Sequence, residues 1–236
     1  MKNGGSVDTH NGNGLTLIRE EASKDKDQGI PKRQNYGGCV DAADEEGSTP
    51  LYAAALNGHV EVVRELLKYD AKVDSSNNNG STPLNTAASK GHVVVVRELL
   101  RNCASVDSAD NNGWTPLNTA ALNGHVDVVR YLPKHGAMVD GVDKNGFTPL
   151  NTAGLNGHVE VVQELLKHGA SVNIANNNGC TPLNTSATRG HVDVVRELLK
   201  YGANVENGKK PWQDASLRSS FRRPRGSCAR AAEIRR

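Results

Sequence analysis

The phrase Gly-x-Thr-Pro-Leu occurs five times in this chain, each time 33 residues after the last. Every copy is followed by Gly-His-Val and then by an apolar run, which reads Val-Val-x-x-Leu-Leu in four of the five copies. A fixed period of this length indicates stacked supersecondary units, because one unit alone is too thin to bury its own apolar face. The phrase begins at Gly47, Gly80, Gly113, Gly146 and Gly179.

The second of these units shows how the sequence builds two helices. Residues 77–80 read Asn-Asn-Asn-Gly, which is typical of a turn because both residue types tolerate positive φ. Thr82 is placed to cap a short helix, with Pro83 at its first position, where no backbone N–H is needed. Gly91 ends that helix, and the apolar spacing over 93–100 predicts a second one. Each unit is therefore a turn, a helix, a tight turn and another helix.

Three short motifs carry a resemblance to a known family. Residues 49–51 (Thr-Pro-Leu), 58–59 (Gly-His) and 62–63 (Val-Val), with their copies in later units, resemble the ankyrin repeat. The resemblance implies an all-α fold, a solenoid of helix-turn-helix units with short β-turn fingers and a 33-residue period. It also implies a non-catalytic module for protein–protein interaction, such as an adaptor, a scaffold or an inhibitor, with no cofactor. We expect such a chain to be a monomer.

The repeat pattern divides the chain into four parts. Residues 1–40 form a polar N-terminal segment that contains a degenerate repeat in the same frame. Residues 206–221 resemble a first helix with a finger four residues shorter, and we expect them to act as a partial C-terminal capping repeat. Residues 222–236 are basic and predicted to be a disordered tail. Between these parts, residues 41–205 hold five repeats, which span 41–73, 74–106, 107–139, 140–172 and 173–205.

Some units depart from the common pattern at positions that affect stability. Gly136 and its copies in the last two units follow the second helix, and we expect them to be left-handed. The first two units have Asp70 and Cys103 there, where a Cβ costs on the order of 1 kcal/mol. Pro133 is predicted to truncate its helix, and Gly154 replaces a helical alanine at a cost of about 1 kcal/mol. We therefore expect the third and fourth repeats to be the least stable.

Composition and segment patterns exclude several classes of protein. Phe and Trp number only two each, so Ala, Val and Leu must form the core. No apolar run approaches the roughly 20 residues that span a bilayer, and the N-terminus lacks a secretory signal. The four cysteines lie far apart without paired spacing, which favours reduced thiols over a disulfide framework or a zinc site. These features predict an intracellular protein without membrane contact, in the cytoplasm or in the nucleus.

Histidine and glutamate often form catalytic or metal sites in proteins. In this chain they recur at the same positions of successive units, which argues against catalysis. The five histidines of the Gly-His-Val motif occupy one slot per unit, too far apart to share one metal ion. We expect them to bond backbone groups between helices. Repeated glutamates, including Glu98 and Glu164, are expected on exposed helix faces. An active site needs different residues at one point, so the sequence predicts neither a catalytic nor a metal site.

The positions that vary while the framework holds are the candidates for partner binding. The residue after the finger glycine changes from Ser81 to Trp114 and Phe147 in neighbouring units, and such aromatics are typical interface anchors. A second interpretation is that each ring packs over its own finger. The resemblance implies binding through the finger tips and the concave face of the first helices. The remaining candidates are Asn78, Asn79, Asn111, Asn112, Lys144, Asn145, Leu122, Asn123, Leu155 and Asn156.

Two further features of the sequence bear on function. An Asn follows Thr-Pro-Leu in four units, at 85, 118, 151 and 184, and we interpret it as a ladder of hydrogen bonds between repeats. The chain from 206 onward has nine basic and three acidic residues, whereas 39–205 has thirteen and eighteen. The alternatives to protein binding are therefore a nuclear regulator whose basic tail contacts nucleic acid, and a drifting repeat copy without a dedicated partner. Because the stack itself is acidic, we regard nucleic acid as the weaker partner class.

Overall fold

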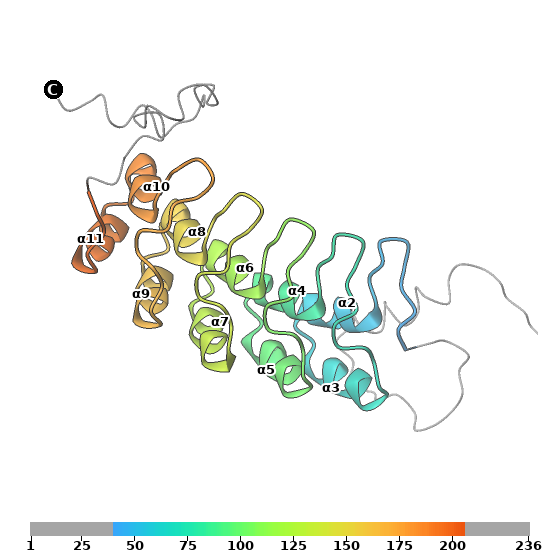
Figure 1. The fold of residues 1–236 in the computed structure, drawn as a ribbon. Helices are drawn as coiled ribbons and strands as arrows, with labels where there is room; N and C mark the ends of the chain where they lie inside the picture. The colour runs from blue at the N-terminus through green and yellow to red at the C-terminus, as the bar shows by residue number, and fades with distance from the viewer. Residues whose placement is uncertain (1–39, 206–236) are drawn as a thin grey trace, which may run out of the picture.

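The computed structural model describes residues 40–205, which form ten α-helices and one 3-10 turn in two rows (Figure 1). The first helices of the units form one row beside the projecting fingers, and the second helices form the other. The first helices are α2 (Pro50–Asn57), α4 (Pro83–Lys90), α6 (Pro116–Leu122), α8 (Pro149–Asn156) and α10 (Pro182–Arg189). The second helices are α3 (Val60–Lys68), α5 (Val93–Arg101), α7 (Val126–Tyr131), α9 (Val159–Lys167) and α11 (Val192–Lys200).

Each first helix begins and ends as its sequence predicts. The Thr82 hydroxyl accepts a hydrogen bond from the backbone N of Asn85, and Pro83 occupies the first helical position. Gly91 then adopts a left-handed φ of 76° and ends α4. The other units repeat this N-terminal arrangement with their own threonine and proline. The predicted caps are therefore confirmed, and within 40–205 the fingers are turns without a strand.

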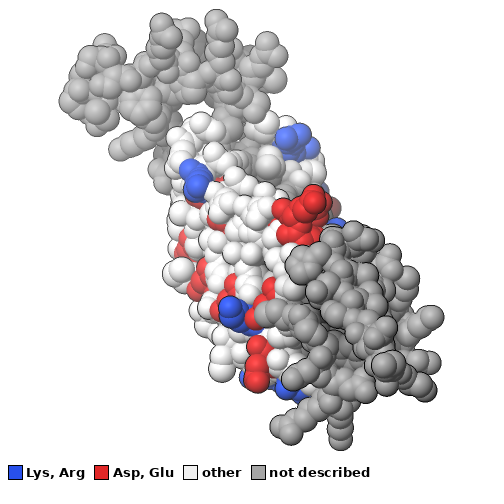
Figure 2. All heavy atoms as spheres, turned by 90° about the vertical axis from the view of Figure 1, so that its right-hand side faces the viewer, with Lys and Arg blue, Asp and Glu red and all other residues white. Residues whose placement is uncertain are grey.

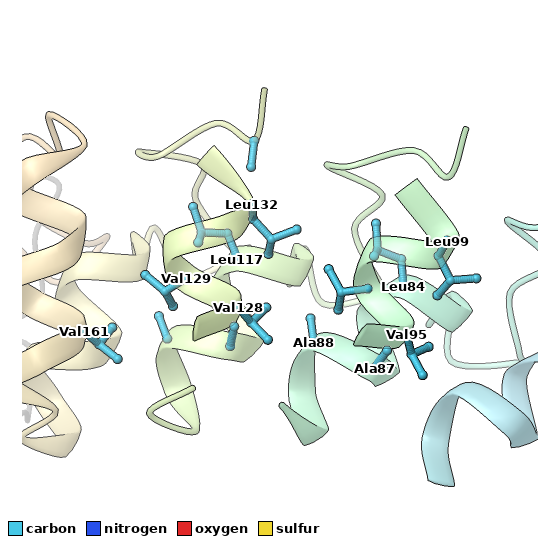
Figure 3. Packing of buried hydrophobic residues seen from close by; sticks show 14 of the residues in the cluster. Leu84, Ala87, Ala88, Val95, Leu99, Leu117, Val128, Val129, Leu132 and Val161 are labelled. Atoms are coloured by element: carbon cyan, nitrogen blue, oxygen red, sulfur yellow. The ribbon is translucent and has the colours of Figure 1, made fainter. Parts of the chain in front are cut away.

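The core is a continuous layer of small and branched side chains between the two rows (Figure 3). In the second unit Leu84 from the first helix and Leu99 from the second are both fully buried. Ala88 is also fully buried, and its short side chain allows neighbouring first helices to approach closely. Leu117 and Leu132 repeat the same pair one unit further along. The core therefore crosses every boundary between units, so no unit buries its apolar face alone.

The ends of the second helices bear out the expectations about left-handed residues and Pro133. Gly136 has a φ of 92°, and Asp70 and Cys103 have φ values of 60° and 62° despite their Cβ atoms. Helix α7 stops at Tyr131, and Pro133–His135 continue as a single 3-10 turn. The turn ends where the other units end, because the backbone N of Ala137 still bonds Leu132 O at 3.2 Å. Pro133 thus shortens the helix without disturbing the return of the chain.

Two of the four cysteines lie among the described residues, and their thiols are in different states. Cys103 is exposed and its thiol is free, as expected. Cys180 is buried and is not free, so the prediction of reduced thiols is wrong at this position. Cys39 and Cys228 lie outside the described residues, as do the degenerate N-terminal repeat, the capping segment and the basic tail.

Candidate functional site

The fingers are rigid turns because a side-chain oxygen closes each one. In the third finger, Asp110 Oδ1 accepts hydrogen bonds from the backbone N of Asn112 at 2.8 Å and of Trp114 at 2.9 Å. In the fourth, Asp143 Oδ1 accepts from Asn145 at 2.9 Å and from Phe147 at 2.7 Å. Short polar side chains favour such turns by satisfying backbone donors two and four residues on. The residue that varies after the finger glycine is therefore held at a defined place.

Neighbouring fingers are also bonded to each other at their tips. The backbone N of Asn111 donates to Asn79 O at 2.9 Å, and its side-chain Nδ2 donates to Asn78 O at 3.0 Å. Asn78 bonds the first finger in the same way. Lys144 keeps the backbone bond to Asn112 O, but a lysine cannot repeat the amide bond. Of the candidate tip residues, Asn78 and Asn111 thus serve the framework, while the side chains of Asn79 and Asn112 stay exposed.

The aromatic candidates Trp114 and Phe147 lie on adjacent fingers, and both are half-buried. Their equivalent in the second unit, Ser81, is also half-buried. The carbonyl of Trp114 accepts a hydrogen bond from Asn85 Nδ2 at 2.7 Å, and the carbonyl of Phe147 accepts one from Asn118 Nδ2 at 3.4 Å. The preceding unit therefore fixes the backbone from which each ring projects. Each ring keeps some exposed surface and loses the rest to the protein.

The asparagine that follows Thr-Pro-Leu forms the expected ladder between units. Asn118 Nδ2 also donates to Gly141 O at 3.2 Å, and Asn151 Nδ2 donates to Ile174 O and Cys180 O at 3.3 and 3.4 Å. The interpretation of this asparagine as framework is confirmed for Asn85, Asn118 and Asn151, whose amides span the boundary to the next finger. Asn184 makes no such bond among the described residues.

The ends of the first helices present apolar and amide side chains together. Leu122 and Leu155 are half-buried, whereas Asn123 and Asn156 are exposed. Asn123 Nδ2 donates to Thr119 O at 2.9 Å, and Asn156 Nδ2 donates to Thr152 O at 3.0 Å. Each amide thus satisfies a carbonyl of its own helix. Asn123 Nδ2 also donates to the Ser89 hydroxyl of the preceding unit at 3.2 Å. The Oδ1 of each asparagine makes no hydrogen bond within the described part of the chain, so both offer acceptors on this face.

The histidines of the Gly-His-Val motif bond the backbone of the preceding unit. Nε2 of His125 lies 2.9 Å from Ser89 O, and Nε2 of His158 lies 3.0 Å from Leu122 O. His92 and His191 make the equivalent contacts at 3.2 and 3.1 Å. The structural interpretation is confirmed for these four residues. Within 40–205 no three potential ligands are grouped so that they could hold a metal ion.

The outer face contradicts one expectation about the glutamates. Glu98 and Glu164 are each only 8% exposed, so their placement on exposed helix faces was wrong. Arg64 from the preceding unit reaches Glu98 at 3.0 Å, and Arg101 reaches it at 2.8 Å. Arg130 lies 3.4 Å from Glu164 in the same way. The hydrogen bond from Arg64 is the main cause that holds the pKa of Glu98 below its ordinary value, against the opposing effect of burial.

Sequence reasoning missed an aromatic cluster on the same face. Tyr131 stands where four units have glutamate, and its ring stacks on His135 with the ring centroids 4.0 Å apart. The guanidinium of Arg97 lies 5.1 Å from the centre of the Tyr131 ring, within the range of a cation–π contact. The replacement of the repeated glutamate was the signal that could have revealed it. The cluster stands where Arg64–Glu98 and Arg130–Glu164 form ion pairs at two other boundaries.

A hollow of about 340 Å³ beside Gly157 and Gly190 is lined mainly by valine and glycine, and His191 there already contacts Leu155 O. On the face drawn in Figure 2, acidic and basic side chains are scattered over a mostly uncharged surface.

Comparisons with known proteins agree with this geometry. A family model described as ankyrin repeats in three copies matches residues 30–110, 71–143, 95–176 and 136–209. A search of curated proteins finds no match. No helix in the described range 40–205 has both the length and the apolar character to cross a bilayer. Because the family matches span most of the chain and the structure shows its helix pairs and fingers, the chain belongs to the ankyrin repeat family.

Proposed function

We propose that this chain is a non-catalytic module that binds a polypeptide partner across its third and fourth units. The binding face consists of the finger residues Asn112, Trp114, Lys144, Asn145 and Phe147 and the first-helix ends Leu122, Asn123, Leu155 and Asn156. Ankyrin repeats are generally protein-interaction modules, which sets the class of the proposal.

The proposal rests on a difference between two sets of polar groups. One set is bonded to neighbouring units, and the other remains on the surface. Asparagines 78, 111, 118 and 151 and the histidines are bonded to neighbouring units. The binding face itself presents half-buried apolar side chains, one lysine and exposed asparagines. Among these asparagines, Asn123 also donates to Ser89 Oγ at 3.2 Å and Asn145 to Asp143 Oδ2 at 3.4 Å, and their Oδ1 atoms remain as acceptors. Protein interfaces combine an apolar centre with a polar rim in this way. A partner that donates hydrogen bonds and supplies an apolar side chain is complementary to it.

The direct test compares partner capture by three forms of the full chain. The first is unchanged, the second has Asn112→Glu and Asn145→Glu on the binding face, and the third has Val94→Glu and Met138→Glu elsewhere. All four positions are exposed, so the substitutions leave the core intact and add the same charge. We expect a protein from source-cell lysate to bind the first and third forms and to be lost from the second. Circular dichroism checks that all three remain folded.

Two further controls separate the alternatives. Nuclease treatment of the lysate should leave capture unchanged, whereas a nucleic-acid regulator would lose its binding and would also lose it on deletion of 222–236. Trp114→Ser with Phe147→Ser tests the aromatic anchors by the same assay. Equal capture by the binding-face and control forms would refute the proposed face. Failure of every form to capture a protein would favour the drifting copy.

A further inference from the structure

The last described unit exposes the side that every earlier unit buries against its successor. We call this the end face, made of Leu183, Asn184, Ala187, Val195 and Leu199. The leucines equivalent to Leu183 and the valines equivalent to Val195 in the three preceding units are fully buried, but these two residues are only half-buried. Leu199 is 45% exposed, whereas its equivalent Leu166 is 6% exposed. In Figure 1 no described helix lies beyond α10 and α11.

The end face also has unused positions for a following unit. Asn151 Nδ2 bonds two carbonyls of the next finger, while Asn184 Nδ2 makes no such bond among the described residues. The Cα of Gly157 lies against the ring of His191, but around Gly190 a Cβ would meet nothing within 4 Å. The end face therefore has the same kinds of amide donor and apolar side chain as the faces that meet between two interior units. The face is therefore shaped for one more first helix rather than for solvent.

The segment that directly follows the last unit has the sequence of such a helix. Residues 211–217, Pro-Trp-Gln-Asp-Ala-Ser-Leu, align with 149–155, Pro-Leu-Asn-Thr-Ala-Gly-Leu. Trp212 takes the place of leucines that are fully buried in the four first helices followed by another described unit and half-buried in the last one, Leu183. Leu217 takes the place of Leu155. No Val-Val-x-x-Leu-Leu run follows, so the segment has the pattern of a first helix without a second one.

We propose that residues 211–221 dock on the end face as a single helix that closes the stack. Interior packing supplies the register: a Cβ on Gly154 would lie 3.3 Å from Pro182 O and 3.7 Å from the hydroxyl of Thr185. Ala187 therefore meets Pro211 and Asp214, and Trp212 covers Leu183 and Val195. The helix also carries Arg218, and a polar outward surface is what terminates a repeat stack.

The connection favours this segment over a second copy of the chain. Only five residues separate Val205, already at the end of the stack and 75% exposed, from Pro211. A short linker gives an effective concentration of about millimolar, which a second copy at micromolar concentration does not match. The tethered helix therefore occupies the face first.

Tryptophan fluorescence of the full chain tests the docking. The chain has two tryptophans, so Trp114→Phe leaves Trp212 as the sole reporter. We expect its emission at short wavelength and protected from acrylamide. Adding Leu199→Asp should shift the emission to longer wavelength and increase quenching. Val94→Asp is the matched control, because Val94 has the same 45% exposure and the other units carry Asp or Glu at its position.

Hydrogen exchange gives a second readout that does not depend on the reporter. Trp212→Ser should accelerate exchange of the α11 amides and leave those of α3 unchanged. The proposal is overturned if Trp212 is as accessible to acrylamide in the native chain as in urea, or if Trp212→Ser leaves α11 exchange unchanged. Protection that appears only at high protein concentration would assign the end face to a second copy and equally overturn it.

Discussion

At the scale of the residue, a close steric constraint joins a glycine of one unit to a histidine of the next. Gly91 needs its left-handed φ of 76°, and a Cβ there would lie 2.6 Å from Nδ1 of His125. The same glycine therefore serves both the turn and the boundary. At this position a side chain is disfavoured both by the left-handed backbone and by the contact with the histidine. A comparison between two units separates these two effects.

The comparison uses Gly91→Ala and Gly190→Ala. Gly190 has nearly the same φ, 77°, but a Cβ there would meet no atom of the described residues within 4 Å, so alanine adds the left-handed strain of about 1–2 kcal/mol without a clash among them. We expect Gly91→Ala to lower the free energy of unfolding by more, because His125 must also move and lose its bond to Ser89 O. Urea denaturation measures both. Equal losses would show that the histidine contact adds nothing.

A second prediction at this scale concerns the buried carboxylate of Glu98. Its pKa in the folded chain is lowered, chiefly by the hydrogen bond from Arg64. The pair therefore stabilises the fold above the unfolded pKa of a glutamate, about 4.3, and the contribution is lost as pH falls through the folded value. Denaturation across this acid range should show a smaller pH dependence in Arg64→Gln. Arg196→Gln is the control, since Arg196 reaches only the exposed Asp193; an identical effect in both variants would contradict the prediction.

At the scale of the element, each first helix is bonded to the finger that follows it. Asn151 spans this boundary and Asn184 does not, although both occupy the same position and help to cap their own helices. Asn151→Ala should therefore lower the free energy of unfolding by about 1–3 kcal/mol more than Asn184→Ala, because it leaves the buried carbonyl of Cys180 and the part-buried carbonyl of Ile174 without this donor. Chemical denaturation of the two variants measures the difference. Equal losses of unfolding free energy in the two variants would show that these asparagines stabilise the fold only by capping their own helices.

The third unit offers a test of helix length. Pro133 stops α7 at Tyr131 and stands where Leu166 is buried one unit later. Pro133→Leu should restore a backbone donor and an apolar side chain, and so extend α7 and raise the free energy of unfolding by up to about 3 kcal/mol. Helical circular dichroism and urea denaturation measure the two effects. An unchanged spectrum with unchanged stability would mean that the 3-10 turn fits this boundary as well as a helix does.

At the scale of the whole molecule, stability in a stack is the sum of unit terms and boundary terms. The third unit has a shortened helix and the fourth has Gly154 in place of alanine, so we expect these two to open first. Hydrogen exchange on the full chain should show faster exchange in α7 and α8 than in α4 and α5. Gly154→Ala should slow exchange in α8 if helix propensity outweighs the crowding at Pro182 O. Uniform exchange along the stack would contradict this prediction.

The sequence by itself determined the architecture, because the 33-residue period, the Thr-Pro caps and the left-handed glycines are local signals. It also predicted the asparagine ladder and the structural histidines, since their repetition excludes convergence on one point. Only the tertiary structure decided which polar residues remain available. Arg64 of the first unit forms an ion pair with Glu98 of the second, and the amide of Asn111 donates a hydrogen bond to the preceding finger. Contacts between units lie about 33 residues apart in the chain, so side-chain partners depend on how units stack rather than on local pattern.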